Sequence, residues 1–323
     1  MSSSRIEHER LVVIGSGPAA YTAAIYAARA LLKPLVLAGF EHGGQLMTTT
    51  DVENYPGFAD PIQGPWLMEQ MRAQAGHVGA RIESEYVIAL ELGRRPFLIR
   101  CDSGRIFAAE AIILATGAKA KYLGLASEEA FKGFGVSACA TCDGFFFRGK
   151  TVAVIGGGNT AVEEALHLSN LAAHVTVVHR RDSFRAEKIL SERLASRHNV
   201  SIRWNTAVES ILGDPPPRGV TAIRLRNVVS GALDDLTVDG VFVAIGHEPA
   251  SELVRGQVAL KSNGYVQTAP GSTATSVEGV FAAGDVADDI FRQAVTAAGL
   301  GCMAALEAER WLAAEEPKRA AAE

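Results

Sequence analysis

The chain has few cysteines and no long apolar run. Its 323 residues include 4 cysteines, too few for the disulfide framework of a small secreted protein. Arg29 and Lys33 interrupt the longest apolar stretch, so no segment reaches the roughly 18 residues that a membrane-spanning helix needs. The first residues are polar and lack the apolar centre of a signal peptide. We therefore expect a soluble, cytoplasmic protein with no membrane segment.

Positive charge is also scarce. The chain carries 31 Lys and Arg against 36 Asp and Glu, and the resulting net charge of −5 argues against non-specific nucleic-acid binding. A hydrophobic fraction of 48% and a charged fraction of 21% are typical of globular proteins. Glycine, in contrast, is abundant at 32 residues, which suits a backbone that approaches ligand phosphates closely. The length allows two domains of ordinary size.

Two of the cysteines lie in the most informative segment, C-A-T-C-D at residues 139–143. Cys139 and Cys142 have the spacing of a reversible disulfide, and Asp143 can handle protons as that disulfide opens and closes. The alternative is half of a zinc site. Such a site needs further ligands, but Cys101 and Cys302 stand alone and no histidine pair has ligand spacing. We interpret the pair as a redox centre, the other two cysteines as inert, and expect no metal.

A strand, glycine turn, helix and strand follow one another near the N-terminus. Residues 11–14 form a short apolar run that predicts a buried parallel strand. The turn G-S-G-P-A-A at 15–20, a helix to about residue 32 and a strand at 34–38 follow. In this context a G-x-G-x-x-A match predicts a dinucleotide-binding turn. Gly15 makes the turn, Gly17 admits a pyrophosphate at the helix N-terminus, and Ala20 allows close helix–strand packing.

The same order recurs from residue 151. A strand at 152–155 precedes the turn G-G-G-N-T-A at 156–161, a helix to about 171 and a strand at 175–178. Each repeat is closed by a further strand, at 111–115 and 241–244, that runs into Gly117 and Gly246 respectively. We expect these two glycines to mark the crossings between domains. The second glycine-rich turn lies just after the redox pair, which suggests electron transfer between a dinucleotide and sulfur.

The residues after Gly246 are too few for a third domain. A strand at 279–285 and a helix at about 291–312 are expected to complete the first domain. The predicted fold is α/β, with two Rossmann-like three-layer nucleotide-binding domains, the second inserted into the first. The first comprises residues 1–117 and 247–323, and the second comprises 118–246 with the redox pair. A proline run at 215–217 predicts a surface loop, and the tail from 313 is expected to be solvated or frayed.

The residues after each second strand distinguish the two nucleotides. An acid usually binds the ribose 2′-hydroxyl there, whereas arginine accommodates a 2′-phosphate. The second repeat has Arg180, Arg181 and Arg185 in this region, which favours NADPH over the alternative of a solvated basic loop. The first repeat has Glu41, which suits an adenosine without a 2′-phosphate. FAD is the most economical second cofactor, because a flavin accepts hydride and passes two electrons to sulfur.

Taken together, these motifs resemble the bacterial low-molecular-weight thioredoxin reductases over about residues 10–312. The matching segments are G-S-G-P-A at 15–19, G-G-Q-L at 43–46, E-N at 53–54, A-T-G at 115–117, C-A-T-C-D-G at 139–144, G-G-G-N-T-A at 156–161, H-R-R at 179–181, G-D at 284–285 and R-Q-A at 292–294. The resemblance implies NADPH:thioredoxin-disulfide reductase activity, bound FAD, a homodimer, and alternating rotation of the domains about Gly117 and Gly246.

The resemblance also implies roles for individual residues. Cys142 receives electrons from the flavin, Cys139 attacks the partner disulfide, and Asp143 is the acid and base. The expected FAD residues are Gly15, Gly17, Pro18, Ala19, Glu41, Gly44, Gln45, Asn54, Gly117, Asp285, Arg292, Gln293 and Ala294. The expected NADPH residues are Gly156, Gly158, Asn159, Thr160, His179, Arg180, Arg181, Arg185 and Gly246.

The chain differs from its best-known relatives at one position, and one aromatic segment has two possible interpretations. Phe134 stands where those relatives carry an arginine near the partner surface. The phenylalanines at 145–147 resemble an aromatic groove for thioredoxin, with core packing on a buried strand as the alternative. Three rival functions are a ferredoxin–NADP reductase, a dithiol oxidase and a non-catalytic redox sensor, and the dithiol, Asp143 and the arginines together disfavour all three. A hydroperoxide-reductase flavoprotein would need an N-terminal disulfide domain that the chain has no room for.

Overall fold

The computed structural model describes residues 6–48, 51–214 and 219–320, so the predicted proline loop lies outside the described residues. The chain divides into two compact units: residues 1–119 with 248–323, and residues 120–247. These divisions fall within two residues of Gly117 and Gly246. Within the described ranges, no helix combines the length and apolar character needed to cross a membrane.

The first unit is built on a seven-stranded sheet with the order β5-β2-β1-β8-β7-β6, to which β19 adds beside β8. Its strands are β1 (Ile6–Ile14), β2 (Leu35–Leu37), β5 (Arg81–Glu83), β6 (Val87–Glu91), β7 (Phe97–Cys101), β8 (Ile106–Leu114) and β19 (Val280–Ala282). Strands β5, β2, β1, β8 and β19 are parallel, whereas β6, β7 and β8 are antiparallel. The second half of β1 is buried on both faces, as a central parallel strand requires.

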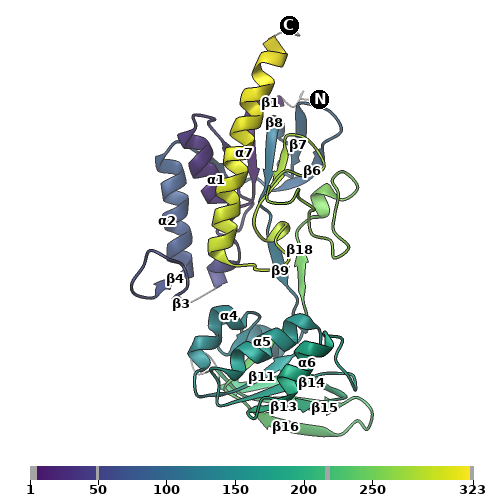
Figure 1. Cartoon of the computed structure of the whole chain (residues 1–323). Helices are drawn as coiled ribbons and strands as arrows, with labels where there is room; N and C mark the ends of the chain where they lie inside the picture. Colours follow the sequence, from purple (N-terminus) through teal and green to yellow (C-terminus); the bar gives the residue numbers. More distant parts are fainter. Residues whose placement is uncertain (1–5, 49–50, 215–218, 321–323) are drawn as a thin grey trace. The chain divides into compact units, whose positions relative to one another are not determined.

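Three helices cover one face of this sheet: α1 (Pro18–Arg29), α2 (Gly64–His77) and α7 (Ala294–Ala320). Helix α1 lies between α2 and α7 (Figure 1). Proline at the first helical position presets the backbone for α1, and six alanines favour the helix and leave room for close packing. A Cβ atom on Gly301 of α7 would overlap the carbonyl oxygen of Ala19, so only glycine allows this approach of the two backbones.

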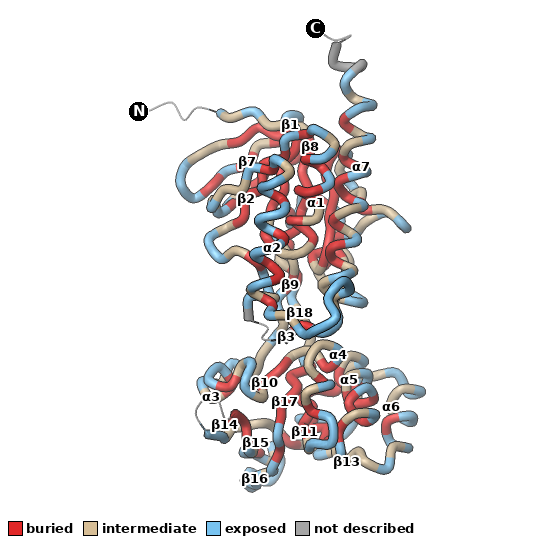
Figure 2. The backbone as a smooth tube through the Cα atoms, turned by 90° about the vertical axis from the view of Figure 1, so that its left-hand side faces the viewer, coloured by how far each residue is buried: buried red, intermediate tan, exposed pale blue. Residues whose placement is uncertain are grey.

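The other face of the first sheet packs against strands and loops. Apolar residues of β6 and β7 join a second cluster with Val254, Val258 and Val266. Figure 2 shows buried residues running through the strands and the adjoining sides of the helices. The remaining short elements are the 3-10 helices η1 (Gly44–Thr48), η3 (Glu252–Val254) and η4 (Gly284–Val286), and the hairpin strands β3 (Asp51–Val52) and β4 (Ile62–Gln63).

The final helix differs from its predicted bounds at both ends. It starts at Ala294 rather than 291, because a turn capped by Asp288 occupies residues 290–292. It continues to Ala320, beyond the predicted end at 312, although residues 313 and 314 are solvated as expected. The guanidinium of Arg95 lies over the Trp311 ring, 4.6 Å from its centroid, and pairs with Glu315 at 3.4 Å. These contacts stabilise the additional helical turns.

The second unit has three layers around a five-stranded parallel sheet of order β10-β17-β11-β12-β13. The strands are β10 (Val136–Ser137), β11 (Thr151–Ile155), β12 (His174–Val178), β13 (Val200–Arg203) and β17 (Gly240–Val243). Helices α4 (Ala140–Asp143), α5 (Asn159–Ser169) and α6 (Lys188–Ala195) pack on one face, next to the 3-10 helix η2 (Gly144–Phe147). A three-stranded antiparallel sheet, β14 (Thr206–Asp214), β15 (Gly219–Asn227) and β16 (Leu233–Thr237), covers the other face with α3 (Ala126–Ala130) nearby.

A two-stranded ribbon of β9 (Ala118–Ala120) and β18 (His247–Pro249) carries the chain through both crossings. The amide of Ala250 donates to the Gly117 carbonyl at 2.9 Å, and the amide of Lys121 donates to the Gly246 carbonyl at 2.9 Å. Gly117 and Gly246 have φ values of 75° and 104°, which favour glycine. Since a Cβ atom at either site would meet nothing within 4 Å, backbone conformation rather than crowding requires these glycines.

Candidate active site

The first glycine turn has one tight and one open position. Gly15 has a φ of 126°, and a Cβ atom there would overlap the carbonyl oxygen of Ala115 at the end of the neighbouring strand. A Cβ atom on Gly17 would meet nothing within 4 Å, and no side chain caps the start of α1 at this residue. Uncapped amides beside open space form a suitable site for a pyrophosphate at a helix N-terminus.

The loop after β2 is tied directly to this turn. The buried hydroxyl of Ser16 donates to the Glu41 carbonyl at 3.4 Å and accepts the Gly43 amide at 3.2 Å. A Cβ atom on Gly44 would lie 3.4 Å from the Cα of Gly17. The structure therefore brings together the predicted FAD residues of the turn and of the loop, through a serine that the motif left unassigned.

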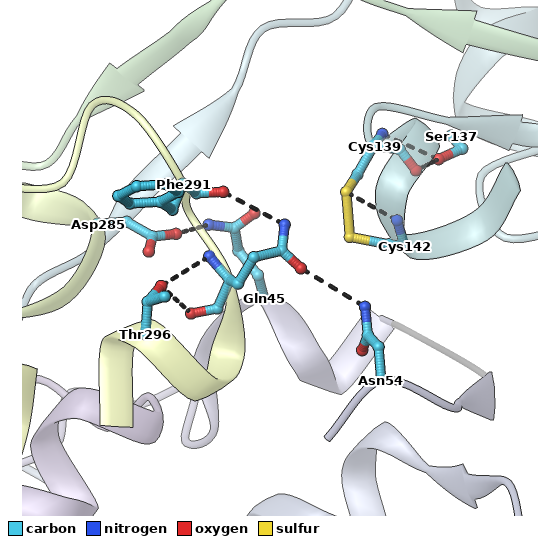
Figure 3. The surroundings of a disulfide bond; sticks show 9 residues. Gln45, Asn54, Ser137, Cys139, Cys142, Asp285, Phe291 and Thr296 are labelled. Carbon is cyan, nitrogen blue, oxygen red and sulfur yellow. Dashed lines mark hydrogen bonds between the residues drawn. A yellow bond between two sulfur atoms is a disulfide. The ribbon is translucent and has the colours of Figure 1, made fainter. Parts of the chain in front are cut away.

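Gln45 and Asp285 form a second part of this site. The amide nitrogen of Gln45 donates to the carboxylate of Asp285 at 3.4 Å (Figure 3). It also donates to the carbonyl of Ala118. The pKa of Asp285 is raised from 3.8 to about 6, mainly by burial and also by the neighbouring Asp288, while Arg292 and Gln45 oppose the shift. A half-buried carboxyl group that is held by Gln45 is well suited to bind a polar cofactor group.

Asn54 and Gln293 bring the β3–β4 segment to the start of α7, with 3.5 Å between the Asn54 amide nitrogen and the Gln293 amide oxygen (Figure 3). Arg292, just before this helix, has a φ of 49°, a conformation that costs a non-glycine residue about 1–3 kcal/mol. The carboxylate of Asp288 accepts the amides of Ile290, Phe291 and Arg292 at 2.9–3.0 Å and so holds the turn. Sequence analysis missed Asp288, although an aspartate before a helix is a common capping signal.

The second glycine turn follows the same plan. A Cβ atom on Gly156 would overlap the carbonyl oxygen of Ala244 and approach the Cβ of Ala161 to 2.7 Å, whereas Gly158 has open space. Asn159 starts α5, and its side chain accepts the Glu187 amide at 2.9 Å. Thr160 is half-buried in the first turn of α5. This turn therefore also leaves a helix N-terminus free for phosphate.

The three predicted arginines lie in the loop after β12 and have no carboxylate partners among the residues that the structure describes. Arg180, Arg181 and Arg185 are all exposed. The amide of Arg185 donates to the Gly157 carbonyl at 2.7 Å, which fixes the loop beside the turn. His179 differs from them, because its ring is buried rather than directed to solvent. Unpaired guanidinium groups at this place fit a 2′-phosphate.

Cys139 and Cys142 form a disulfide at the start of α4 (Figure 3). The amide of Cys142 donates to the Cys139 sulfur at 3.2 Å, and the amide of Cys139 donates to the Ser137 hydroxyl at 3.0 Å. An amide that already points at a sulfur atom stabilises the thiolate that forms there when the disulfide opens. Burial raises the pKa of Asp143, while a hydrogen bond with Ser137 lowers it, so a protonated carboxyl persists to a higher pH than usual.

The phenylalanine run has two environments rather than one. It forms the 3-10 helix η2, not a strand. Phe147 packs in the core against Phe242, with ring centroids 5.2 Å apart, whereas Phe145 is exposed and Phe146 is half-buried. Core packing therefore applies to Phe147 and in part to Phe146, which packs against the same cluster, whereas Phe145 is outside it. Phe134 is 40% exposed, and the nearby Lys132 ammonium lies over the Tyr122 ring, 3.9 Å from its centroid.

These elements define a class of protein: two dinucleotide-binding units, one of which carries a redox disulfide. A family model described as pyridine nucleotide-disulphide oxidoreductase matches residues 9–301, and the chain belongs to this family. Membership confirms the predicted α/β fold class and the use of FAD and NADPH. The glycine turns fit both cofactors, since each leaves a helix N-terminus open.

The chain is similar over most of its length to proteins named thioredoxin reductase. The protein of Rickettsia conorii is 57% identical over 303 residues, which cover 94% of this chain and 98% of the relative. The structure of thioredoxin reductase from Giardia duodenalis has a TM-score of 0.90 and 42% identity, and the match covers 95% of this chain and 99% of that one. A Pseudomonas fluorescens protein named glucosaminate ammonia-lyase is 53% identical over 314 residues, covering 95% of this chain and 97% of that protein. Similarity to known thioredoxin reductases confirms the resemblance predicted from the sequence.

Proposed function

We propose that this protein is an NADPH-dependent flavoprotein disulfide reductase whose substrate is oxidised thioredoxin. The observation that carries the proposal is the Cys139–Cys142 disulfide, in the same unit as a glycine turn flanked by three unpaired arginines. When bound, FAD supplies the step that a side chain cannot perform, namely accepting a hydride from NADPH and returning two electrons to a disulfide. A dithiol has no evident use in the elimination of ammonia, so the site favours the reductase over the lyase activity named for one relative.

The chain's own residues bind and orient the two nucleotides. In the first unit, the uncapped start of α1, the 41–45 loop, Asp285 and the turn before α7 form the proposed FAD site. In the second unit, the start of α5 binds the pyrophosphate of NADPH and the arginines bind its 2′-phosphate. Residues 1–119 with 248–323 are thus the FAD unit, and residues 120–247 are the NADPH unit.

The dithiol transfers its electrons by thiol–disulfide exchange. The Cys139 thiolate attacks one sulfur of the thioredoxin disulfide and forms a mixed disulfide, and a thioredoxin thiolate leaves. Cys142 then attacks the Cys139 sulfur, re-forms the internal disulfide and releases the second thioredoxin thiolate. The partner gains two electrons and two protons. Asp143, next to the pair and with a raised pKa, donates and recovers a proton in this cycle.

Alternating access to the flavin requires the inserted unit to turn. We assign this motion to the β9–β18 ribbon, because Gly117 and Gly246 combine positive φ values with free space around their Cα atoms. Residues with these properties can change φ and ψ without displacing neighbours.

A homodimer is the proposed assembly. Val295, Met303 and Leu306 are exposed on α7, at spacings that place them on one side of the helix. A second copy that covers this apolar strip would remove it from water. Met303→Glu with Leu306→Glu should convert a dimer into a monomer in sedimentation experiments, and an unchanged mass would reject this interface. A cytoplasmic location, expected from the sequence, is tested by cell fractionation.

The test of function is NADPH oxidation by the purified holoprotein with oxidised thioredoxin. The Cys142→Ser variant should lose turnover while its flavin is still reduced by NADPH, and Cys302→Ser, outside the site, serves as the control and should match the parent. Flavin reduction without thioredoxin turnover in the parent would move the proposal to another disulfide substrate. Release of ammonia from glucosaminate at a rate that Cys142→Ser leaves unchanged would favour the lyase instead.

A further inference from the structure

Each glycine turn contacts the loop that follows the next strand of its unit. In the first unit the contacting side chain belongs to the turn, and in the second it belongs to the loop. In the first turn the middle residue is Ser16, and its side chain reaches the loop after β2. In the second turn the middle residue is Gly157, which has no side chain, and the loop after β12 reaches the turn with the ring of His179. A Cβ atom on Gly157 would lie 2.6 Å from the Nε2 atom of His179 and would overlap the rest of the ring edge. The imidazole therefore occupies the space that a side chain at position 157 would need.

Aromatic side chains hold the His179 ring in this place. Phe184 lies 5.9 Å from it between centroids and Trp204 lies 6.1 Å from it, and these two rings are 4.6 Å apart. The His179 residue is only 5% exposed. Its Nε2 atom is buried and has no hydrogen-bond partner among the residues that the structure describes. Such a ring fills the space beside Gly157.

The backbone on both sides of His179 is also fixed. Its amide donates to the Arg203 carbonyl at 3.0 Å, and its carbonyl accepts the Thr206 amide at 2.9 Å. Further along the loop, the Arg185 amide donates to the Gly157 carbonyl at 2.7 Å. The imidazole therefore lies against the turn expected to bind pyrophosphate, at the start of the loop that carries the arginines expected to bind the 2′-phosphate.

We propose that His179 is a positioning residue, a buried spacer that sets the separation between the Gly157 turn and the arginine loop and thereby favours NADPH over NADH. The inference rests on the proposed NADPH site. It replaces the sequence-based expectation that His179 contacts the nucleotide together with its neighbouring arginines. Specificity depends on it because both ends of one nucleotide must be bound at once, and small displacements of binding groups weaken such binding.

A neutral ring is required for this role. Burial lowers the pKa of His179, and the charges of Arg185, Arg181 and Arg180 lower it further, while a backbone hydrogen bond with Ser183 opposes the shift. The ionisable groups that face it are thus the three arginines. The three arginines would repel a positive charge on the imidazole ring, so the ring stays uncharged at neutral pH.

The test is a double-mutant cycle in the full-length holoprotein, with binding of NADP⁺ and NAD⁺ measured by calorimetry so that no turnover is involved. His179→Ala should weaken NADP⁺ binding about tenfold by loosening the arginine loop and should weaken NAD⁺ binding much less. Gly157→Ala should weaken both, because its methyl group displaces the ring. The double variant should bind NADP⁺ better than Gly157→Ala alone, because removing the ring makes room for the methyl group.

The outcomes separate packing from direct contact. If the double variant binds NADP⁺ no better than Gly157→Ala alone, the ring does not act through the space that it fills beside Gly157, and the proposal is overturned. His179→Phe, which retains a flat ring, should keep most of the preference for NADP⁺, whereas a loss equal to that of His179→Ala also contradicts the spacer role. Flavin content and near-ultraviolet circular dichroism verify folding of each variant. If the parent itself shows no preference for NADP⁺, the NADPH assignment fails rather than the role of His179.

Discussion

Ionised Asp285 should lower the stability of the FAD-depleted protein, although the same side chain is proposed to bind FAD. Burial is the main reason that its pKa rises from 3.8 to about 6. Each pH unit of difference corresponds to about 1.4 kcal/mol, so ionised Asp285 costs up to about 3 kcal/mol of unfolding free energy at pH 8. The unfolded chain releases its proton near pH 3.8 and the folded one near pH 6, so the cost develops as the pH rises through this window. At pH 4.5 the same relation leaves a cost of only about 1 kcal/mol.

The substitution Asp285→Asn removes this charge and keeps the shape. FAD-depleted Asp285→Asn should be more stable than the depleted parent, by about 3 kcal/mol at pH 8 and about 1 kcal/mol at pH 4.5. Urea unfolding followed by the fluorescence of Trp66 and Trp311 measures this, in a Trp204→Phe background that removes the tryptophan of the other unit. The same variant should bind FAD more weakly. A stability difference that is constant or shrinks as the pH rises would refute the reasoning.

Three further predictions follow from glycines and from Asp143. Gly301→Ala should destabilise the first unit by about 1–3 kcal/mol or more, because its methyl group overlaps the backbone of α1, whereas Gly299→Ala in the same helix should be neutral or slightly stabilising in thermal melts. Gly117→Ala and Gly246→Ala should each cost about 1–2 kcal/mol through their positive φ values and lower kcat more than NADPH binding; full turnover in both would exclude them as hinges. Asp143→Asn should slow reduction of the partner about a hundredfold and remove one ionisation from the pH–rate profile, and an unaltered profile would reject its role in proton transfer.

Local patterns made the glycine turns predictable. Each turn is set by a few consecutive residues whose backbone must bend and approach a neighbouring strand. A Cβ atom on Gly15 or Gly156 would overlap the carbonyl oxygen of Ala115 or Ala244 respectively, although these partners lie far away in the sequence. The turn motif therefore carries information about a long-range contact, which is why both units could be recognised without a structure.

Long-range side-chain contacts were not predictable in this way. The proline run at 215–217 predicts a loop in this region, but the sequence does not show that the β14–β15–β16 layer takes the place of helices on that face. Helix α7 begins later than predicted because of Asp288, whose carboxylate accepts hydrogen bonds from the amides of residues 290–292. His179 was grouped with its arginine neighbours because position along the chain does not reveal that its ring turns inward to Gly157.

The discontinuity of the first unit has a consequence for synthesis on the ribosome. The inserted unit, residues 120–247, is complete in sequence before β19 and α7 have been translated. Strand β8 lacks its neighbour β19, and helix α1 lacks its packing partner α7, until the last part of the chain emerges. The NADPH unit can therefore fold as soon as it is released, while the FAD unit must wait for the C-terminus. Premature termination before residue 294 would leave a finished inserted unit attached to a sheet with one helix missing.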